Sequence, residues 1–157
     1  MANLKISVDG SYVDADHIYG AVVVQNCDTK QLLTYLITCP NKELASSRNV
    51  YGEVAAAAFG LLVANEALEI DPDTNVILIH DYEGVKKWAT GEWKSKKPIS
   101  QLYTHVISKM PKLMDRVTFI HQKSHTGITS ENSYLNHLAD RIAALEVKPG
   151  FTIEALF

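Results

Sequence analysis

The sequence begins with a regular alternation of apolar and polar residues. Residues 4–9 alternate as a half-buried strand does, and residues 18–25, which are rich in valine, and residues 31–38 show two further strand patterns. The polar stretches between them, including residues 12–16, are short and predict turns. Because short connections join antiparallel strands, we expect a three-stranded antiparallel meander at the start of the chain.

The pattern changes to helical spacing after a polar and irregular stretch. Residues 51–68 carry an apolar stripe rich in alanine, which favours a helix by its period and by its intrinsic propensity. Residues 76–80 are nearly all apolar, as in a strand covered on both faces, and a strand that follows a helix indicates a parallel crossover. The remaining pattern predicts a short helix, a longer helix, a strand and a last helix, in residues 82–90, 99–113, 117–121 and 131–145.

These elements predict one mixed α/β domain. Its sheet would have five strands, three antiparallel strands followed by two parallel ones, flanked by helices. No linker or repeat interrupts residues 1–146, and we expect residues 147–157 to form a C-terminal tail that packs on the domain as a strand or a hook. Within the second strand, Gly20 is expected to mark a bulge or a close approach of another backbone.

Composition and charge narrow the function classes. The 157-residue chain has a net charge of −3, which excludes a uniformly basic nucleic-acid binder, although lysines gather between positions 86 and 97. No apolar run is long enough to span a membrane and the N-terminus lacks a signal-peptide pattern, so we expect a cytoplasmic protein that does not act at a membrane. Cys27 and Cys39 show no metal-ligand spacing and are expected to be reduced thiols.

Four acidic residues stand at or near the ends of the predicted elements: Asp9, Glu53, Asp81 and Asp140. In this order, their ordinary explanations are an Asp-Gly turn, a favourable helix dipole, a helix cap and a solvated helix surface. Their conjunction favours a shared site, because ligands of open α/β sheets usually lie beyond the C-terminal ends of the strands. Converging carboxylates repel one another unless cations neutralise them, and hard oxygen ligands select magnesium or manganese.

Five segments that follow these elements in order carry a resemblance to a known family. They are VDGS (8–11), RNVYGE (48–53), HDYEGVKKWATGEWK (80–94), KSHTG (123–127) and NHLAD (136–140). Together they resemble the type 1 ribonuclease H family, in the forms found in bacteria and their phages. The resemblance covers nearly the whole chain, from residue 4 to about residue 145.

The resemblance implies hydrolysis of the RNA strand of RNA–DNA hybrids by a two-metal-ion mechanism, leaving 3′-hydroxyl and 5′-phosphate ends. The four carboxylates would hold two Mg²⁺ ions, with Mn²⁺ as an alternative. Asp9 would bridge the ions, and Glu53 would lie near the 2′-hydroxyl, the group that distinguishes RNA from DNA. Asp81 and Asp140 would hold the ion on the nucleophile side. His125 would assist proton transfer or product departure, with a surface histidine as the alternative.

The resemblance also implies contacts with an RNA–DNA hybrid. We expect the protein to bind the hybrid as a monomer. Asn49 has the alternative of capping the long helix, and Trp88 is expected to pack in the core rather than stack on bases. We take His80, His105, His121 and His137 as structural or exposed. The expected substrate-binding residues are Ser11, Tyr12, Arg48, Asn49, Lys94, Lys96 and Lys97.

Two features depart from the family pattern. His125 precedes Asp140 by 15 positions, more than is usual in the family, so extra residues around 129–135 lengthen either the loop or the helix. Glu83 stands where many relatives have a glutamine that contacts substrate, so its charge must point away from phosphates or pair with Lys86 or Lys87. A non-catalytic nucleic-acid-binding module and a DNA-processing nuclease on the same fold are the alternative functions.

Overall fold

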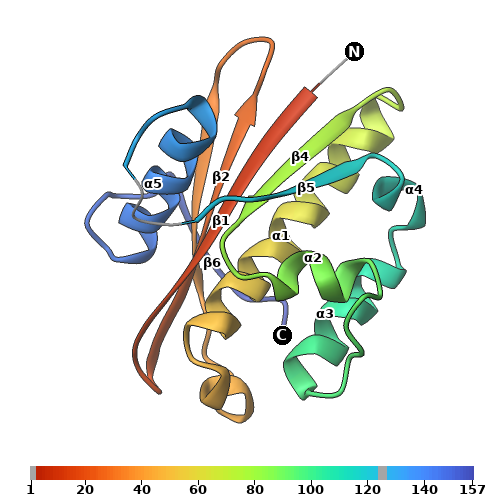
Figure 1. Cartoon of the computed structure of the whole chain (residues 1–157). Coiled ribbons are helices and arrows are strands. Elements are labelled where there is room, and N and C mark those ends of the chain that lie inside the picture. The colour runs from red at the N-terminus through yellow and green to blue at the C-terminus, as the bar shows by residue number, and fades with distance from the viewer. Residues whose placement is uncertain (1–2, 124–126) are drawn as a thin grey trace.

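A computed structural model describes residues 3–123 and 127–157 as a six-stranded sheet with helices on both faces (Figure 1). The strands are β1 (Asn3–Asp14), β2 (His17–Asn26), β3 (Leu32–Thr38), β4 (Asn75–His80), β5 (Val117–His121) and β6 (Phe151–Glu154). They stand in the order β5-β4-β1-β2-β3-β6. β2 is antiparallel to β1 and β3, whereas β4 is parallel to β1 and β5, and β6 is parallel to β3.

The mixed α/β sheet that the sequence predicts is confirmed, with one strand more than the five expected. The additional strand is β6, which lies in the C-terminal tail and pairs with β3 from Tyr35 opposite Phe151 to Thr38 opposite Glu154. A strand of four residues gives little periodic signal in the sequence. The tail therefore forms one edge of the sheet, and β5 forms the other.

β1 is longer than its sequence pattern predicts. The turn predicted in residues 12–16 is confined to residues 15–16, because β1 continues to Asp14. Its pairing with β2 passes through Asp9, which lies opposite Ala21. The ladder of backbone hydrogen bonds with β2 thus overrides the turn preference of the Asp-Gly pair.

The helices divide between the two faces of the sheet. They are α1 (Asn49–Ile70), α2 (Gly84–Ala89), α3 (Pro98–Ser108), α4 (Pro111–Met114) and α5 (Glu131–Ala143), with a 3-10 helix, η1 (Lys42–Ser47), before α1. α5 covers one face, and α1 covers the other together with α2, α3 and α4 (Figure 1). The helix predicted over residues 99–113 is two helices, because Pro111 has no N–H to continue the bonding of α3. Of the helices in the described part of the chain, none has the length and hydropathy that crossing a membrane requires.

Three glycines let α1 lie directly on the backbone of β1 and β2. A Cβ atom at Gly10 would overlap the backbone of Asn49, and one at Gly52 would overlap the backbone carbonyl of Tyr19. Gly20 faces Gly52 across the same contact, which confirms the close approach predicted for Gly20. The start of α1 therefore rests on the sheet with no side chain between them.

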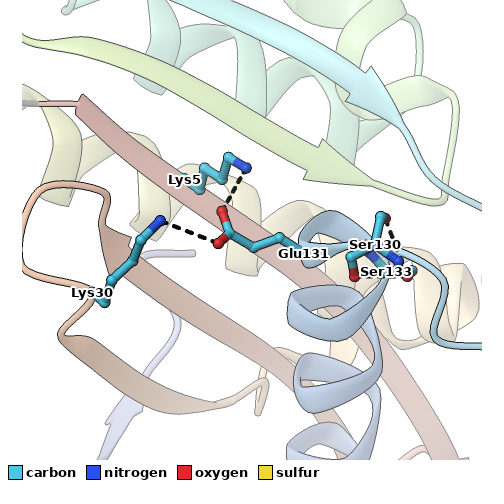
Figure 2. Close-up of polar contacts among 5 residues, drawn as sticks. All are labelled: Lys5, Lys30, Ser130, Glu131 and Ser133. Carbon is cyan, nitrogen blue, oxygen red and sulfur yellow. Dashed lines mark hydrogen bonds and ion pairs between the residues drawn. The ribbon is translucent and has the colours of Figure 1, made fainter.

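Polar contacts fix the start of α5 against the sheet (Figure 2). Glu131 accepts hydrogen bonds from the amino groups of Lys5 in β1, at 2.7 Å, and Lys30 in the turn before β3, at 3.2 Å. Ser130 caps the helix, since its hydroxyl accepts a hydrogen bond from the N–H of Ser133. The position of α5 along β1 is therefore set at its first turn.

Candidate active site

The structure brings together the four carboxylates that the sequence singles out. Asp9 lies within β1, Glu53 in the second turn of α1, Asp81 directly after β4 and Asp140 in α5. Asp9, Glu53 and Asp81 line one cleft of about 280 Å³. Asp140 lines a small hollow near it, and its side chain is hydrogen-bonded to that of Asp9. Four elements thus deliver four carboxylates to one site.

Two members of this group are buried, which makes their negative charge unfavourable. Asp9 is 8% exposed and Glu53 is 5% exposed. Burial, followed by the charge of Glu53 and the hydrogen bond with Asp140, raises the pKa of Asp9 to about 9. Burial also raises the pKa of Glu53 to about 7, although hydrogen bonds from backbone N–H groups oppose this increase. At neutral pH the group therefore retains protons unless cations replace them.

Glu53 connects α1 to the end of β4. Its Oε2 atom accepts a hydrogen bond from the N–H of Tyr82 at 2.6 Å and a longer one from the N–H of Asp81 at 3.2 Å. One carboxylate oxygen thus holds two consecutive backbone amides. This contact fixes where the chain leaves β4, and hence where Asp81 lies relative to α1.

The ordinary explanations for the carboxylates do not describe the structure. Asp9 is a strand residue and not part of a turn. Glu53 is buried beyond the first turn of α1 rather than exposed at its start. Asp81 does not cap a helix, because α2 begins at Gly84 with Glu83 as its N-cap. The burial of Asp9 and Glu53, and the placement of all three residues, are those of a shared polar site.

The extra residues before Asp140 belong mostly to the helix. Residues 129–135 lie between His125 and Asp140, and α5 begins within them at Glu131, as the sequence predicts. Of the two alternatives, the earlier helix start therefore describes the structure, and Asp140 lies well inside a continuous helix. His125 is outside the described residues, and its role stays a prediction.

Part of the predicted substrate-binding set lies beside the cleft. Asn49 lines the cleft and is the first residue of α1, whereas the capping position is held by Arg48. The guanidinium group of Arg48 lies over the ring of Tyr12, 5.6 Å from its centroid. Tyr12 and Ser11 follow Asp9 along β1 on the same strand. The ends of β1 and α1 therefore present an aromatic, cationic and amide surface next to the carboxylates.

The three lysines of the basic segment come from another part of the chain. Lys94, Lys96 and Lys97 are exposed in the segment between α2 and α3. That segment follows Trp93, which lines the cleft. Trp88 is 8% exposed and belongs to the hydrophobic core, as predicted.

Glu83 forms an ion pair with Lys87. Its carboxylate lies 3.6 Å from the amino group of Lys87, which in turn lies over the ring of Trp93 at 5.0 Å from its centroid. The pairing expected for Glu83 is therefore confirmed with Lys87. It offsets part of the negative charge at the rim of the cleft.

His121, interpreted from the sequence only as structural or exposed, contacts the backbone beside the cleft. It ends β5 opposite His80, the last residue of β4, and its Nε2 atom lies 2.6 Å from the backbone carbonyl oxygen of Asp81. The same nitrogen lies 3.8 Å from Oδ1 of Asp81. The signal was available, because two adjacent parallel strands both end in Ile-His and their C-terminal ends must lie side by side.

The donors at this site fit a hard divalent cation in their chemistry. They are carboxylate oxygens, and burial, together with neighbouring negative charge, raises the pKa values of Asp9 and Glu53, so a bound cation would favour their charged forms. In residues 3–123 and 127–157, no three histidine, cysteine or acidic side chains are arranged so that they could hold a metal ion. The ligand set Asp9, Glu53, Asp81 and Asp140 therefore stays a prediction.

Comparison with known proteins gives a likeness in fold. No protein-family model and no curated protein matches the sequence. Among solved structures, ribonuclease H1 from the halophilic archaeon Halobacterium salinarum is 18% identical with a TM-score of 0.63, over 92% of this chain and 99% of that one. LC11-RNase H1, solved in complex with an RNA/DNA hybrid, is 17% identical with a TM-score of 0.61, over 90% and 99% of the two chains.

A bacterial domain gives a similar result. The N-terminal ribonuclease H domain of Rv2228c from Mycobacterium tuberculosis, solved as a fusion with maltose-binding protein, is 17% identical with a TM-score of 0.60. The match covers 93% of this chain and 96% of that one. At such identities the likeness concerns architecture, and on that evidence the chain has the ribonuclease H-like fold.

Proposed function

We propose that the protein is a metal-dependent endonuclease that hydrolyses the RNA strand of RNA–DNA hybrids. The observation that carries the proposal is the convergence of Asp9, Glu53, Asp81 and Asp140, two of them buried and with raised pKa values. A group of this kind is suited to bind divalent cations and unsuited to a structural role. The likeness in fold to ribonuclease H domains, one of them solved with an RNA/DNA hybrid, supports the same activity.

In this proposal the four carboxylates hold two Mg²⁺ ions, with Mn²⁺ as a substitute. When bound, such ions supply a nucleophilic hydroxide and stabilise the charge on the leaving oxygen, which leaves 3′-hydroxyl and 5′-phosphate ends. Glu53 has a second duty, because it also holds the backbone amides of Asp81 and Tyr82. It would lie near the 2′-hydroxyl of the RNA strand, and His125 would assist proton transfer or product departure.

The remaining residues of the proposal bind and orient the hybrid. Phosphates would contact the lysines of the exposed segment and Arg48. The guanidinium group of Arg48 lies over the ring of Tyr12. Asn49 lines the cleft next to the carboxylates and would donate hydrogen bonds to the sugar edge of the minor groove. The substrate set is completed by Ser11, Lys94, Lys96 and Lys97.

The test compares labelled RNA–DNA hybrid, duplex RNA and duplex DNA, each with EDTA, Mg²⁺ or Mn²⁺. We expect cleavage of the RNA strand of the hybrid alone, and only with a divalent cation. Extension of the products by a polymerase identifies the 3′-hydroxyl ends. Cleavage of duplex DNA would favour a DNA-processing nuclease, and hybrid binding without cleavage would favour a non-catalytic module.

A single substitution distinguishes the site from the rest of the surface. Asp81→Asn should abolish cleavage and preserve the fold, because Glu53 and His121 contact the backbone of Asp81 and keep these contacts in the variant. Circular dichroism and thermal unfolding verify the fold. Wild-type activity in Asp81→Asn would overturn the assignment of the site.

The proposal takes the protein to act as a monomer in the cytoplasm. Sedimentation equilibrium at the concentration of the activity assay measures the oligomeric state. A dimer that loses activity on dilution would contradict this part of the proposal.

A further inference from the structure

The backbone of Asp81 and Tyr82 is held on all sides by ionisable side chains. Both N–H groups donate to Oε2 of Glu53, at 3.2 and 2.6 Å. The carbonyl oxygen of Asp81 lies 2.6 Å from Nε2 of His121, and that of Tyr82 lies 2.9 Å from Nδ1 of His80. Four consecutive backbone groups thus have three side chains as partners.

These contacts begin where the sheet stops. His80 is the last residue of β4, and its carbonyl accepts the last inter-strand hydrogen bond, from the N–H of Gln122 at 2.8 Å. The register of β4 and β5 ends at His80 among the described residues, and the carbonyl groups of Asp81 and Tyr82 follow it. The imidazole rings of His80 and His121, which are paired in the register of the adjacent strands β4 and β5, donate hydrogen bonds to these carbonyl groups instead.

The partners determine which nitrogen of each ring carries hydrogen. A backbone carbonyl only accepts, so the nitrogen facing it must be the donor. His121 is therefore protonated at Nε2 and His80 at Nδ1. His80 is 1% exposed, and its Nε2 atom is buried with no hydrogen-bond partner among the described residues. The single proton of a neutral His80 ring thus serves the carbonyl of Tyr82.

We propose that His121 and His80 are positioning residues for Asp81, each acting through a backbone carbonyl at the end of β4. The inference rests on the proposed function, because Asp81 has a catalytic duty only there. Just beyond the end of a strand, the backbone is not held by the sheet, so the direction of a side chain there varies with the backbone. The two rings remove that freedom on the carbonyl side, as Glu53 does on the amide side, and so fix the direction in which the carboxylate of Asp81 leaves the chain.

A matched pair of substitutions separates this role from direct participation by His121. His121→Gln keeps an N–H donor near the position of Nε2 but neither the charge nor the acid–base capacity of imidazole. His121→Phe keeps the ring and removes the donor. The side chain of His121 is half exposed on an edge strand, so both variants should fold. His105→Phe, at an exposed histidine of α3, serves as the control for adding an exposed phenylalanine.

We expect His121→Phe to lower kcat for hybrid cleavage roughly 10- to 100-fold, the usual loss when a supporting hydrogen bond to a catalytic ligand is removed. KM should change little, because the phosphate and sugar contacts are elsewhere. His121→Gln should recover most of kcat. Equal losses in both variants would mean that His121 acts by its proton or charge, and wild-type kcat in both would mean that it has no role; either result overturns the proposal.

A spectroscopic measurement tests both histidines without activity. Long-range ¹H–¹⁵N correlation spectra at pH 7.5, in the absence of divalent cations, report which ring nitrogen carries hydrogen. The proposal requires the Nε2–H form for His121 and the Nδ1–H form for His80. The opposite form at either ring contradicts it. If the wild-type protein cleaves no hybrid, the proposed function fails, whereas these spectra still decide whether the two rings hold the backbone.

Discussion

The hydroxyl group of Tyr51 donates a hydrogen bond to the backbone carbonyl oxygen of Phe157 at 2.7 Å. Tyr51 is fully buried in the first turn of α1, two residues before Glu53, and its hydroxyl also accepts a hydrogen bond from the N–H of Asn41 at 3.2 Å. One side chain thus joins the tail, the start of η1 and the helix that carries a site carboxylate.

Replacing Tyr51 by phenylalanine should lower the free energy of unfolding by about 1–3 kcal/mol. The substitution keeps the buried ring but leaves the N–H of Asn41 and the carbonyl of Phe157 without their partner. Urea unfolding measures the difference, and Tyr12→Phe, at an exposed tyrosine, serves as the control. Equal stability of Tyr51→Phe and the wild type would show that this hydroxyl does not anchor the tail.

Without divalent cations, the protein should lose stability from pH 7 to pH 9. The folded protein keeps a proton on Asp9 up to a pKa of about 9, whereas the unfolded chain releases it near 3.8. In this window the unfolded state binds fewer protons, so the free energy of unfolding falls as pH rises, by at most about 1.4 kcal/mol per pH unit for one group. Thermal unfolding in EDTA at the two pH values measures the loss.

Asp9→Asn is the control for this prediction. The amide has no proton to release, so the variant should be more stable than the wild type at pH 9 and should show a smaller loss between the two pH values. His80 contributes little here, because burial lowers its pKa to about 4 and its unfolded pKa of 6.5 is also below the window. An unchanged pH dependence in Asp9→Asn would contradict the raised pKa of Asp9.

Gly52→Ala should both destabilise the protein and reduce activity. The added Cβ would overlap the backbone carbonyl of Tyr19, so α1 must move away from β2, and Glu53 moves with it. We expect a loss of about 2–4 kcal/mol in the free energy of unfolding, in the range of severe overpacking. Chemical unfolding and hybrid cleavage at low temperature, where the variant stays folded, measure the two effects.

Gly60→Ala is a matched control in the same helix. Its Cβ would meet only side chains, the nearest being a methyl carbon of Ile6 at 2.9 Å, rather than backbone. Its loss of stability should therefore be smaller, and its effect on activity smaller still. If Gly60→Ala reduced cleavage as much as Gly52→Ala, the backbone contact would not be what places Glu53.

The three exposed lysines between α2 and α3 should account for part of the salt dependence of hybrid binding. Each phosphate contact adds just under one unit to the slope of log K against log salt. Replacing Lys94, Lys96 and Lys97 by glutamine should therefore reduce the slope by up to about three units. The same change at Lys109 and Lys112, which line a groove at the end of α1, should leave it unaltered. If the two variants had the same slope of log K against log salt, the basic segment would not be part of the substrate interface.

Elements with a strong local pattern of apolar and polar residues could be predicted from the sequence. α1 and β4 combine strong periodicity or continuous apolar character with clear ends, so their type and approximate bounds were recognisable. The end predicted for the first strand at Asp9 was wrong because the local turn preference of Asp-Gly competes with the pairing of β1 and β2, which the dipeptide itself does not reveal. β6 was expected only as a strand or a hook of the tail, and its place in the sheet could not be predicted because its partner lies more than 100 positions earlier, as the hydrogen bond between Gly150 and Thr34 shows.

The site shows the same division. The conjunction of Asp and Glu residues at or near the ends of several predicted elements indicated a shared site, although each residue alone had an ordinary explanation. The contact of His121 with the backbone of Asp81 depends on the register of β4 and β5 and spans 40 positions, which single motifs do not contain. The support beneath a site is thus harder to predict than its reactive groups.

The pairing of β6 with β3 also affects how molecules of this protein meet one another. Without β6, the seven residues of β3 would form an open edge with unpaired N–H and carbonyl groups, next to the exposed side chains of Leu32 and Leu33. Such an edge is a template for strand pairing between molecules and hence for aggregation. The tail replaces it with a strand of four residues, so shortening the protein at its C-terminus should reduce its solubility at high concentration.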